Sequence, residues 1–132
     1  MPTVQTQFDF IRIDRRTKRV TPALLAAIRD RIVDHLHPEK IVLFGSRANG
    51  TATLDSDIDL LGILDDKHPL ARVRRRDRFG AIQDLFHHRL FGLDAMVLTA
   101  TEVEKIMDEN EGEWDLVLEI LDEGKILYEQ NQ

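Results

Sequence analysis

With 132 residues, 42% of them hydrophobic and 32% charged, the sequence fits one globular domain and excludes a largely disordered chain. Its formal net charge of −6 disfavours general binding to nucleic acid. The lack of cysteine excludes disulfides and thiolate metal sites and is compatible with a cytoplasmic protein, and no apolar run approaches the roughly 20 residues that span a bilayer.

Residues 1–20 show no clear period, and we expect an extended arm ahead of a single domain at residues 21–132. No basic segment followed by an apolar stretch begins the chain, so no signal peptide is expected. The domain opens with a predicted helix that has Thr21 as its N-cap and Pro22 at its first position. Apolar residues then recur at helical spacing until Pro38 ends the helix.

Two short apolar runs predict buried strands on either side of a polar loop. The first strand is Ile41–Phe44, and the pair Gly45-Ser46 follows it at once. The second strand is Ile58–Leu64, which the chain enters through Asp55-Ser56-Asp57. The loop therefore joins the ends of two strands that we expect to lie in the core.

The next segment is expected to form a long helix from Pro69 to about His88, followed by a third strand at Leu93–Leu98. Thr101 with Glu104 three residues later resembles a capping box, which predicts that another helix opens there. The chain thus alternates between helices and strands.

The C-terminal part predicts a helix around Trp114–Leu121, with Gly124 as its C-cap. Trp114 and the leucines that follow it are expected in the core or in an interface. Ile126–Tyr128 is expected to form a short strand or a packed tail. The predicted fold class is α/β (α+β), with a small mixed sheet flanked by helices.

Two carboxylates are the first candidates for chemistry. Asp57 and Asp59 are two residues apart at the start of a strand, so their side chains point to the same face. Ile58 and Leu60 point to the other face and can enter the core. Two ionised carboxylates this close repel each other unless a cation lies between them, and Mg²⁺ is a hard cation that prefers oxygen ligands.

The loop before the carboxylates fits a phosphate group. Gly45 allows a sharp turn and a close approach of the backbone to a ligand. Ser46 supplies a hydroxyl group, Arg47 can offset phosphate charge, and Gly50 gives a second flexible point. A phosphate cradle beside a carboxylate-bound metal is the arrangement that phosphoryl or nucleotidyl transfer requires.

These motifs together resemble those of a known family. The segments GSRANG and SDIDL resemble the glycine-serine, ten-residue gap and Asp-x-Asp signature of the DNA polymerase β-like nucleotidyltransferases. The short chain is similar to the minimal nucleotidyltransferases of prokaryotes, and the ending EILDEGKILYE resembles their tail. The resemblance implies a polymerase β-like fold.

The resemblance also implies roles for individual residues. Such families use a third carboxylate on a neighbouring strand, for which Asp94 is the matching candidate. Asp57, Asp59 and Asp94 would hold one or two Mg²⁺ ions and carry catalysis. The implied nucleotide-binding residues are Gly45, Ser46, Arg47, Asn49, Gly50 and Ser56. The sequence departs from the family at Asn49, where the family often has arginine. The resemblance then implies that a phosphate contact of this arginine is lost or that the loop is oriented differently.

The implied activity is Mg²⁺-dependent transfer of a nucleoside monophosphate, with AMP from ATP as the preferred version. Many minimal nucleotidyltransferases are encoded beside a HEPN-domain toxin, so the resemblance suggests a HEPN partner, a tyrosine of that partner as the hydroxyl acceptor, and a role as antitoxin. A homo-oligomer is also compatible with an open cleft and an apolar C-terminal helix.

Two other functions remain open from the sequence. The chain could be an antitoxin that neutralises a partner by complex formation, without catalysis. Less favoured is a transferase that acts on a small molecule of the aminoglycoside type, because the chain has no room for a second, acceptor-binding domain.

Each candidate also has a purely structural interpretation. Asp57 and Asp59 could be solvated acids at a strand-edge turn, and Asp94 an exposed strand residue. The basic segment Arg72–Arg78 is interpreted by preference as a solvated helix face that pairs with nearby acids, because its cations surround the helix. The alternative is contact with a partner or with nucleic acid.

Overall fold

The computed structural model describes residues 20–53, 56–86 and 91–130 of the chain. The predicted N-terminal arm at residues 1–20 lies almost wholly outside these ranges. The expected end of the long helix near His88 also lies outside them. No helix in the described ranges has both the length and the apolar character that crossing a bilayer would require.

Four strands form one sheet in the order β3-β2-β1-β4. The strands are β1 (Lys40–Phe44), β2 (Ile58–Leu64), β3 (Leu93–Thr99) and β4 (Lys125–Glu129). β1 runs antiparallel to both β2 and β4, whereas β2 and β3 are parallel. The expected mixed sheet is therefore confirmed, and the C-terminal tail is its fourth strand.

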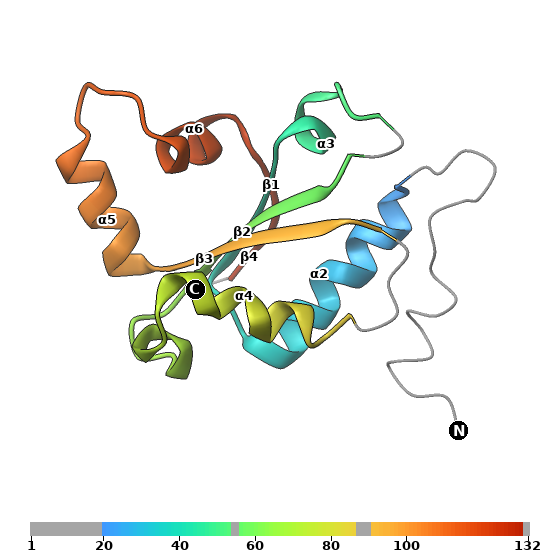
Figure 1. Cartoon of the computed structure of the whole chain (residues 1–132), viewed down its shortest axis with the longest axis horizontal. Coiled ribbons are helices and arrows are strands. Elements are labelled where there is room, and N and C mark those ends of the chain that lie inside the picture. The colour runs from blue at the N-terminus through green and yellow to red at the C-terminus, as the bar shows by residue number, and fades with distance from the viewer. Residues whose placement is uncertain (1–19, 54–55, 87–90, 131–132) are drawn as a thin grey trace.

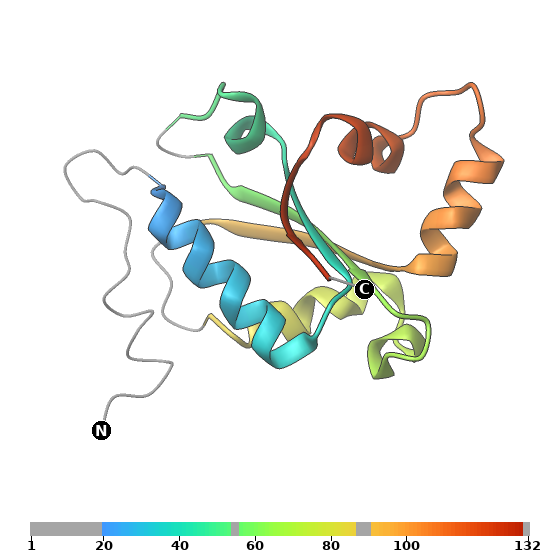
Figure 2. The ribbon, with the colours of Figure 1, turned by 180° about the vertical axis from the view of Figure 1, so that it is seen from behind.

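The helices are divided between the two faces of the sheet. α2 (Pro22–Leu36) and α4 (Arg75–Gln83) cover one face, where Leu24, Ile28 and Ile82 meet the inward residues of the strands. α5 (Ala100–Glu109) and α6 (Leu116–Glu123) cover the other face through a smaller apolar cluster. Both views show this division (Figure 1, Figure 2). The short helix α3 (Ser46–Asn49) follows the end of β1, and its buried Ala48 joins the cluster of α2 and α4.

Local sequence rules set several element ends as predicted. Thr21 caps α2 by accepting a hydrogen bond from the Leu24 amide at 3.1 Å, and Pro22 is the first helical residue. Gly124 ends α6, and its amide donates to the Ile120 carbonyl at 2.8 Å. A side chain at Gly124 would meet Val42, so this glycine also lets α6 lie close to the sheet.

The predicted long helix after Pro69 is wrong, because the segment is divided. It forms a 3₁₀ turn, η1 (Pro69–Arg72), then an extended link, and only then α4. The link is held open by Arg78, whose guanidinium donates to the carbonyls of Val73 at 2.9 Å and Ala71 at 3.3 Å. Those carbonyls are therefore held by a side chain instead of by a continuous helix.

The predicted capping box also lies elsewhere. Thr99 and Glu102 form it, and α5 begins at Ala100. Thr101 cannot serve as the cap, because its amide and hydroxyl both donate to the carboxylate of Asp66. Of the two places expected for Trp114, the core is wrong, because α6 begins only at Leu116 and the Trp114 side chain is 73% exposed, whereas an interface remains a prediction.

Candidate active site

The turn after β1 requires glycine. Gly45 has φ 74° and ψ −157°, a conformation that side-chain-bearing residues rarely adopt. A Cβ at this position would lie 2.5 Å from Oδ2 of Asp59. Gly45 therefore both turns the chain into α3 and leaves room for the Asp59 carboxylate directly against its backbone.

The three predicted carboxylates gather at the end of the sheet where this turn lies. Asp59 on β2 is in register with Asp94 on β3 and with Phe44 on β1, so the three residues form a row on one face. Asp57 precedes β2 by one residue, at the entry to the strand as the predicted bounds Ile58–Leu64 require. The structure thus brings Asp57, Asp59 and Asp94 together at this end of the sheet.

A second glycine, Gly92, leaves room for the carboxylate of Asp57, as Gly45 does for that of Asp59. A Cβ at Gly92 would coincide with Oδ1 of Asp57, and the Gly92 carbonyl accepts the Ile58 amide at 2.8 Å. Sequence reasoning missed this role of Gly92. The available signal was its position, directly before an apolar strand and two residues before Asp94.

The carboxylates of Asp57, Asp59 and Asp94 carry like charges and lie close enough to repel one another. Burial raises the pKa of Asp59, and the neighbouring carboxylates of Asp94 and then Asp57 raise it further. Asp59 is half-buried, whereas Asp57 and Asp94 are exposed. A cation at this place would relieve the repulsion that the three anions exert on one another.

The donor set fits a hard divalent cation. All three side chains offer carboxylate oxygens, which are the ligands that Mg²⁺ prefers. Within residues 20–53, 56–86 and 91–130, no three acidic, histidine or cysteine side chains are already arranged around a common point for a metal. Asp57 and Asp59 would hold Mg²⁺ from β2, with Asp94 joining from β3.

The remaining loop residues hold the site in shape. Arg47 donates to the carbonyl of Ser56 from Nη2 at 2.9 Å and from Nε at 3.3 Å. The Ser56 hydroxyl in turn accepts the Thr53 amide at 2.8 Å. Arg47 and Ser56, both predicted to bind nucleotide, therefore link α3 to the residue directly before Asp57.

Asn49 and Gly50 close the short helix. Oδ1 of Asn49 accepts the Thr51 amide at 3.0 Å and the Thr51 hydroxyl at 2.6 Å. Gly50 follows in the left-handed conformation with φ 83°. Ser46 lies half-buried at the start of α3, and its carbonyl accepts the Thr51 amide at 3.2 Å. Asn49 thus fills a structural place in the turn that follows the glycine-serine motif.

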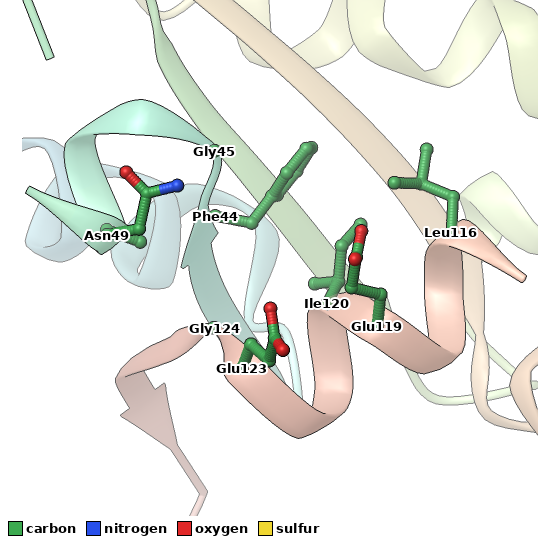
Figure 3. Close-up of a pocket in the computed structure, with 9 residues that line it drawn as sticks. Phe44, Gly45, Asn49, Leu116, Glu119, Ile120, Glu123 and Gly124 are labelled. Carbon is green, nitrogen blue, oxygen red and sulfur yellow. The ribbon is translucent and has the colours of Figure 1, made fainter. Parts of the chain in front are cut away.

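Beside this loop lies a groove of about 300 Å³ between α3 and α6 (Figure 3). Two of its lining residues adjoin Asp59, because Phe44 is in register with it and Gly45 lies against its carboxylate, so the groove lies next to the carboxylate row. Its other lining residues are Ala48, Asn49, Leu116, Glu119, Ile120, Glu123 and Gly124. Sequence reasoning did not predict this groove, because α3 and α6 are distant in the chain.

The basic segment lies away from the carboxylates, in the connection that follows the far end of β2. Arg72, Arg74 and Arg76 are exposed, and Arg75 pairs with Glu102 at 3.1 Å, as the interpretation of a solvated helix face predicted. That interpretation is wrong for Arg78, whose side chain is 3% exposed and contacts Glu102 at 2.6 Å.

Comparison with known proteins shows the family of the chain. The family model described as polymerase beta, nucleotidyltransferase, matches residues 27–132. The chain therefore belongs to the polymerase β nucleotidyltransferase family. A crystal structure from Sulfolobus solfataricus, provisionally named a nucleotidyltransferase, has 20% sequence identity and a TM-score of 0.49, covering 80% of this chain and 82% of that one. The comparison with curated proteins gives no match.

Proposed function

We propose that the protein transfers a nucleoside monophosphate, AMP from ATP, to a hydroxyl group in a Mg²⁺-dependent reaction. One observation carries the proposal: two glycines lie flat against two carboxylates, Gly45 against Asp59 and Gly92 against Asp57, with Asp94 in register beside them. A sheet needs no such paired glycines for its stability. They leave the carboxylates open to a ligand.

The chain's own residues supply most of the chemistry. The backbone at Gly45 and Ser46 receives the phosphates, and Asp94 accepts the proton of the acceptor hydroxyl. The hydroxyl oxygen bonds to the α-phosphorus of ATP while the bond to the bridging oxygen breaks, and pyrophosphate leaves with that electron pair. Mg²⁺, when held by Asp57 and Asp59, offsets the charge of the phosphates and of the pyrophosphate.

The acceptor proposed is a tyrosine hydroxyl of a HEPN-type toxin, with this protein as its antitoxin. Support comes from the resemblance to minimal nucleotidyltransferases and from the open site. Asp57 and Asp94 are both exposed, so a partner can reach the carboxylate row. A protein acceptor would complete in trans a cleft that larger enzymes close with a further domain.

The test uses labelled ATP, Mg²⁺ and the protein encoded by the neighbouring gene. Wild type should label the neighbour, and the double variant Asp57→Asn, Asp59→Asn should not, while its thermal midpoint stays at or above that of wild type. Transfer at the wild-type rate in the double variant would refute the assignment of these carboxylates.

A second candidate is an antitoxin that acts by binding alone. The exposed side chains of Trp114, at 73%, and Leu116, at 40%, favour a partner-binding surface beside the groove. Complex formation without label in the same experiment would support this candidate. Label on the neighbour would support the enzyme.

A further inference from the structure

The groove between α3 and α6 combines an apolar floor with two acidic residues. Phe44, Leu116 and Ile120 supply its apolar lining, while Glu119 and Glu123 lie one helical turn apart on α6 (Figure 3). Within the described part of the chain, neither glutamate forms an ion pair. Like charges at this spacing destabilise a helix slightly, so α6 keeps an unfavourable pair beside the groove.

The charges of the groove select its occupant. A polyphosphate would be repelled by Glu119 and Glu123, so the phosphates of a nucleotide are expected on the other side of Gly45, over the carboxylate row. A lysine or arginine side chain matches both parts of the groove. Its aliphatic stem suits the apolar floor, and its charged head suits the two carboxylates.

The residues around the groove also favour a basic protein segment as its ligand. The segment from Glu102 to Glu123 contains one basic residue, Lys105, among many acids. Trp114 and Leu116 provide an exposed apolar platform at the start of α6, and Leu116 also lines the groove. Aromatic anchors within a charged rim are typical of protein interfaces.

We infer that this groove binds a basic segment of the acceptor protein, with a lysine or arginine side chain between Glu119 and Glu123. The inference rests on the proposed function and deepens it, because it states the chemistry of the acceptor. A cationic residue in the groove would place the neighbouring residues of the acceptor next to Gly45 and the carboxylate row.

Binding can be tested without catalysis. Fluorescently labelled polylysine is titrated with the full-length protein at low salt, and polyglutamate serves as the negative probe. Trp114 is the single tryptophan of the chain, so a change in its emission reports binding at this end of α6. We expect polylysine to bind and to change this emission, and polyglutamate to do neither.

The variant Glu119→Gln, Glu123→Gln removes both charges from the groove. We expect its affinity for polylysine to fall on the order of tenfold. The matched control is Glu104→Gln, Asp108→Asn, which removes two exposed charges at the same spacing on α5 and should change the affinity less than twofold. Equal losses in the two variants would show general attraction to an acidic protein and would overturn the inference.

The affinity for ATP tests whether the groove binds the nucleotide instead of a basic segment. It should stay within about twofold of wild type in both variants. If the groove variant weakened ATP binding and left polylysine binding unchanged, the groove would belong to the nucleotide and the inference would be overturned.

Transfer to a lysine–tyrosine copolymer separates this inference from the proposed function. Normal glutamate-dependent binding without any transfer would sink the proposed activity and leave the groove assignment standing. Transfer that is equally fast in the groove variant would overturn the groove assignment and leave the activity standing.

Discussion

The carboxylate row and the Arg78–Glu102 cluster lie at opposite ends of β2 and treat charge in opposite ways. At one end, Asp57, Asp59 and Asp94 are like charges, and the pKa of Asp59 is raised by burial and by its two neighbours. At the other end, Arg78 donates to both oxygens of Glu102, at 2.6 Å and 3.2 Å. The carboxylates therefore repel one another at the first end, whereas at the second end the charge of Glu102 is paired with that of Arg78.

The second cluster shows what a structural charge needs. Burial alone would raise the pKa of Glu102, but hydrogen bonds from Arg78, the Thr99 amide and Arg75 outweigh it and lower this pKa from 4.5 to about 2. Arg78 also donates to the Val97 carbonyl at 3.1 Å and thereby joins α4 to β3. Among the described residues, no side chain donates to the carboxylate row, which is the expected difference between a site that binds a cation and a cluster that stabilises the fold.

The largest expected effect is the loss of transfer in Asp59→Asn. We expect a decrease of roughly 10³- to 10⁴-fold, because one metal ligand and its charge are removed. In the presence of a chelator the same variant should melt slightly higher, by on the order of 1–3 °C, because it relieves repulsion. Calorimetry with and without Mg²⁺ checks this, and a lower midpoint in chelator would contradict the picture of stored repulsion.

Arg78→Met should affect stability instead of chemistry. It takes one donor from Glu102, which keeps Arg75 and the Thr99 amide, and it removes the guanidinium from the carbonyls that it holds, so we expect the free energy of unfolding to fall by about 3–5 kcal/mol. Urea denaturation measures this change. Arg76→Met is the matched control, because Arg76 is exposed, and it should cost less than about 0.5 kcal/mol. Similar losses in both variants would contradict the difference between the two arginines.

Gly92→Ala tests the packing around Asp57. The added methyl group coincides with the Asp57 carboxylate, so this side chain must move, and transfer should fall on the order of 10²-fold. Gly62→Ala is the control on β2, where an added Cβ meets nothing within 4 Å. The two variants are compared by their transfer rates at equal folded fraction. Equal rates would show that Gly92 has no role in the site.

Glu102→Gln gives the pH dependence of the structural cluster. The pKa of Glu102 is lower in the folded protein than its ordinary value, so its stabilisation is present above about pH 4.5 and is lost as the pH falls towards about 2. We expect wild type to exceed the variant by about 1–2 kcal/mol at pH 7. The gap should shrink through this range in urea titrations, and a gap that grew on acidification would reverse the assignment.

The sequence predicted those parts of the fold that local rules determine. Apolar runs marked β1, β2 and β3 to within a residue, and Thr21 marked the start of α2. The predictions failed where a distant side chain competes with a local pattern. Arg78 divides the helix after Pro69, and Asp66 takes the hydroxyl of Thr101. Neither contact can be predicted from the periodicity of apolar residues.

The candidate residues of the site follow from the motif and the resemblance, whereas their contacts do not. The register of β2 and β3 pairs Asp59 with Asp94, the carboxylate that the resemblance implied, and Asp57 directly precedes β2. The link from Arg47 to Ser56 and the groove beside α6 depend on how a loop and a distant helix pack. Such packing has no signature in a single sequence.

The smallest effect is expected for Asn49→Ala, which tests the departure from the family's usual arginine. Oδ1 of Asn49 accepts two hydrogen bonds from Thr51, so its removal should cost about 1 kcal/mol of stability. Transfer should fall less than about threefold, because the side chain supports the turn while the carboxylate row stays in place. A fall as large as that of Gly92→Ala, at unchanged stability, would move Asn49 from the turn to direct nucleotide contact.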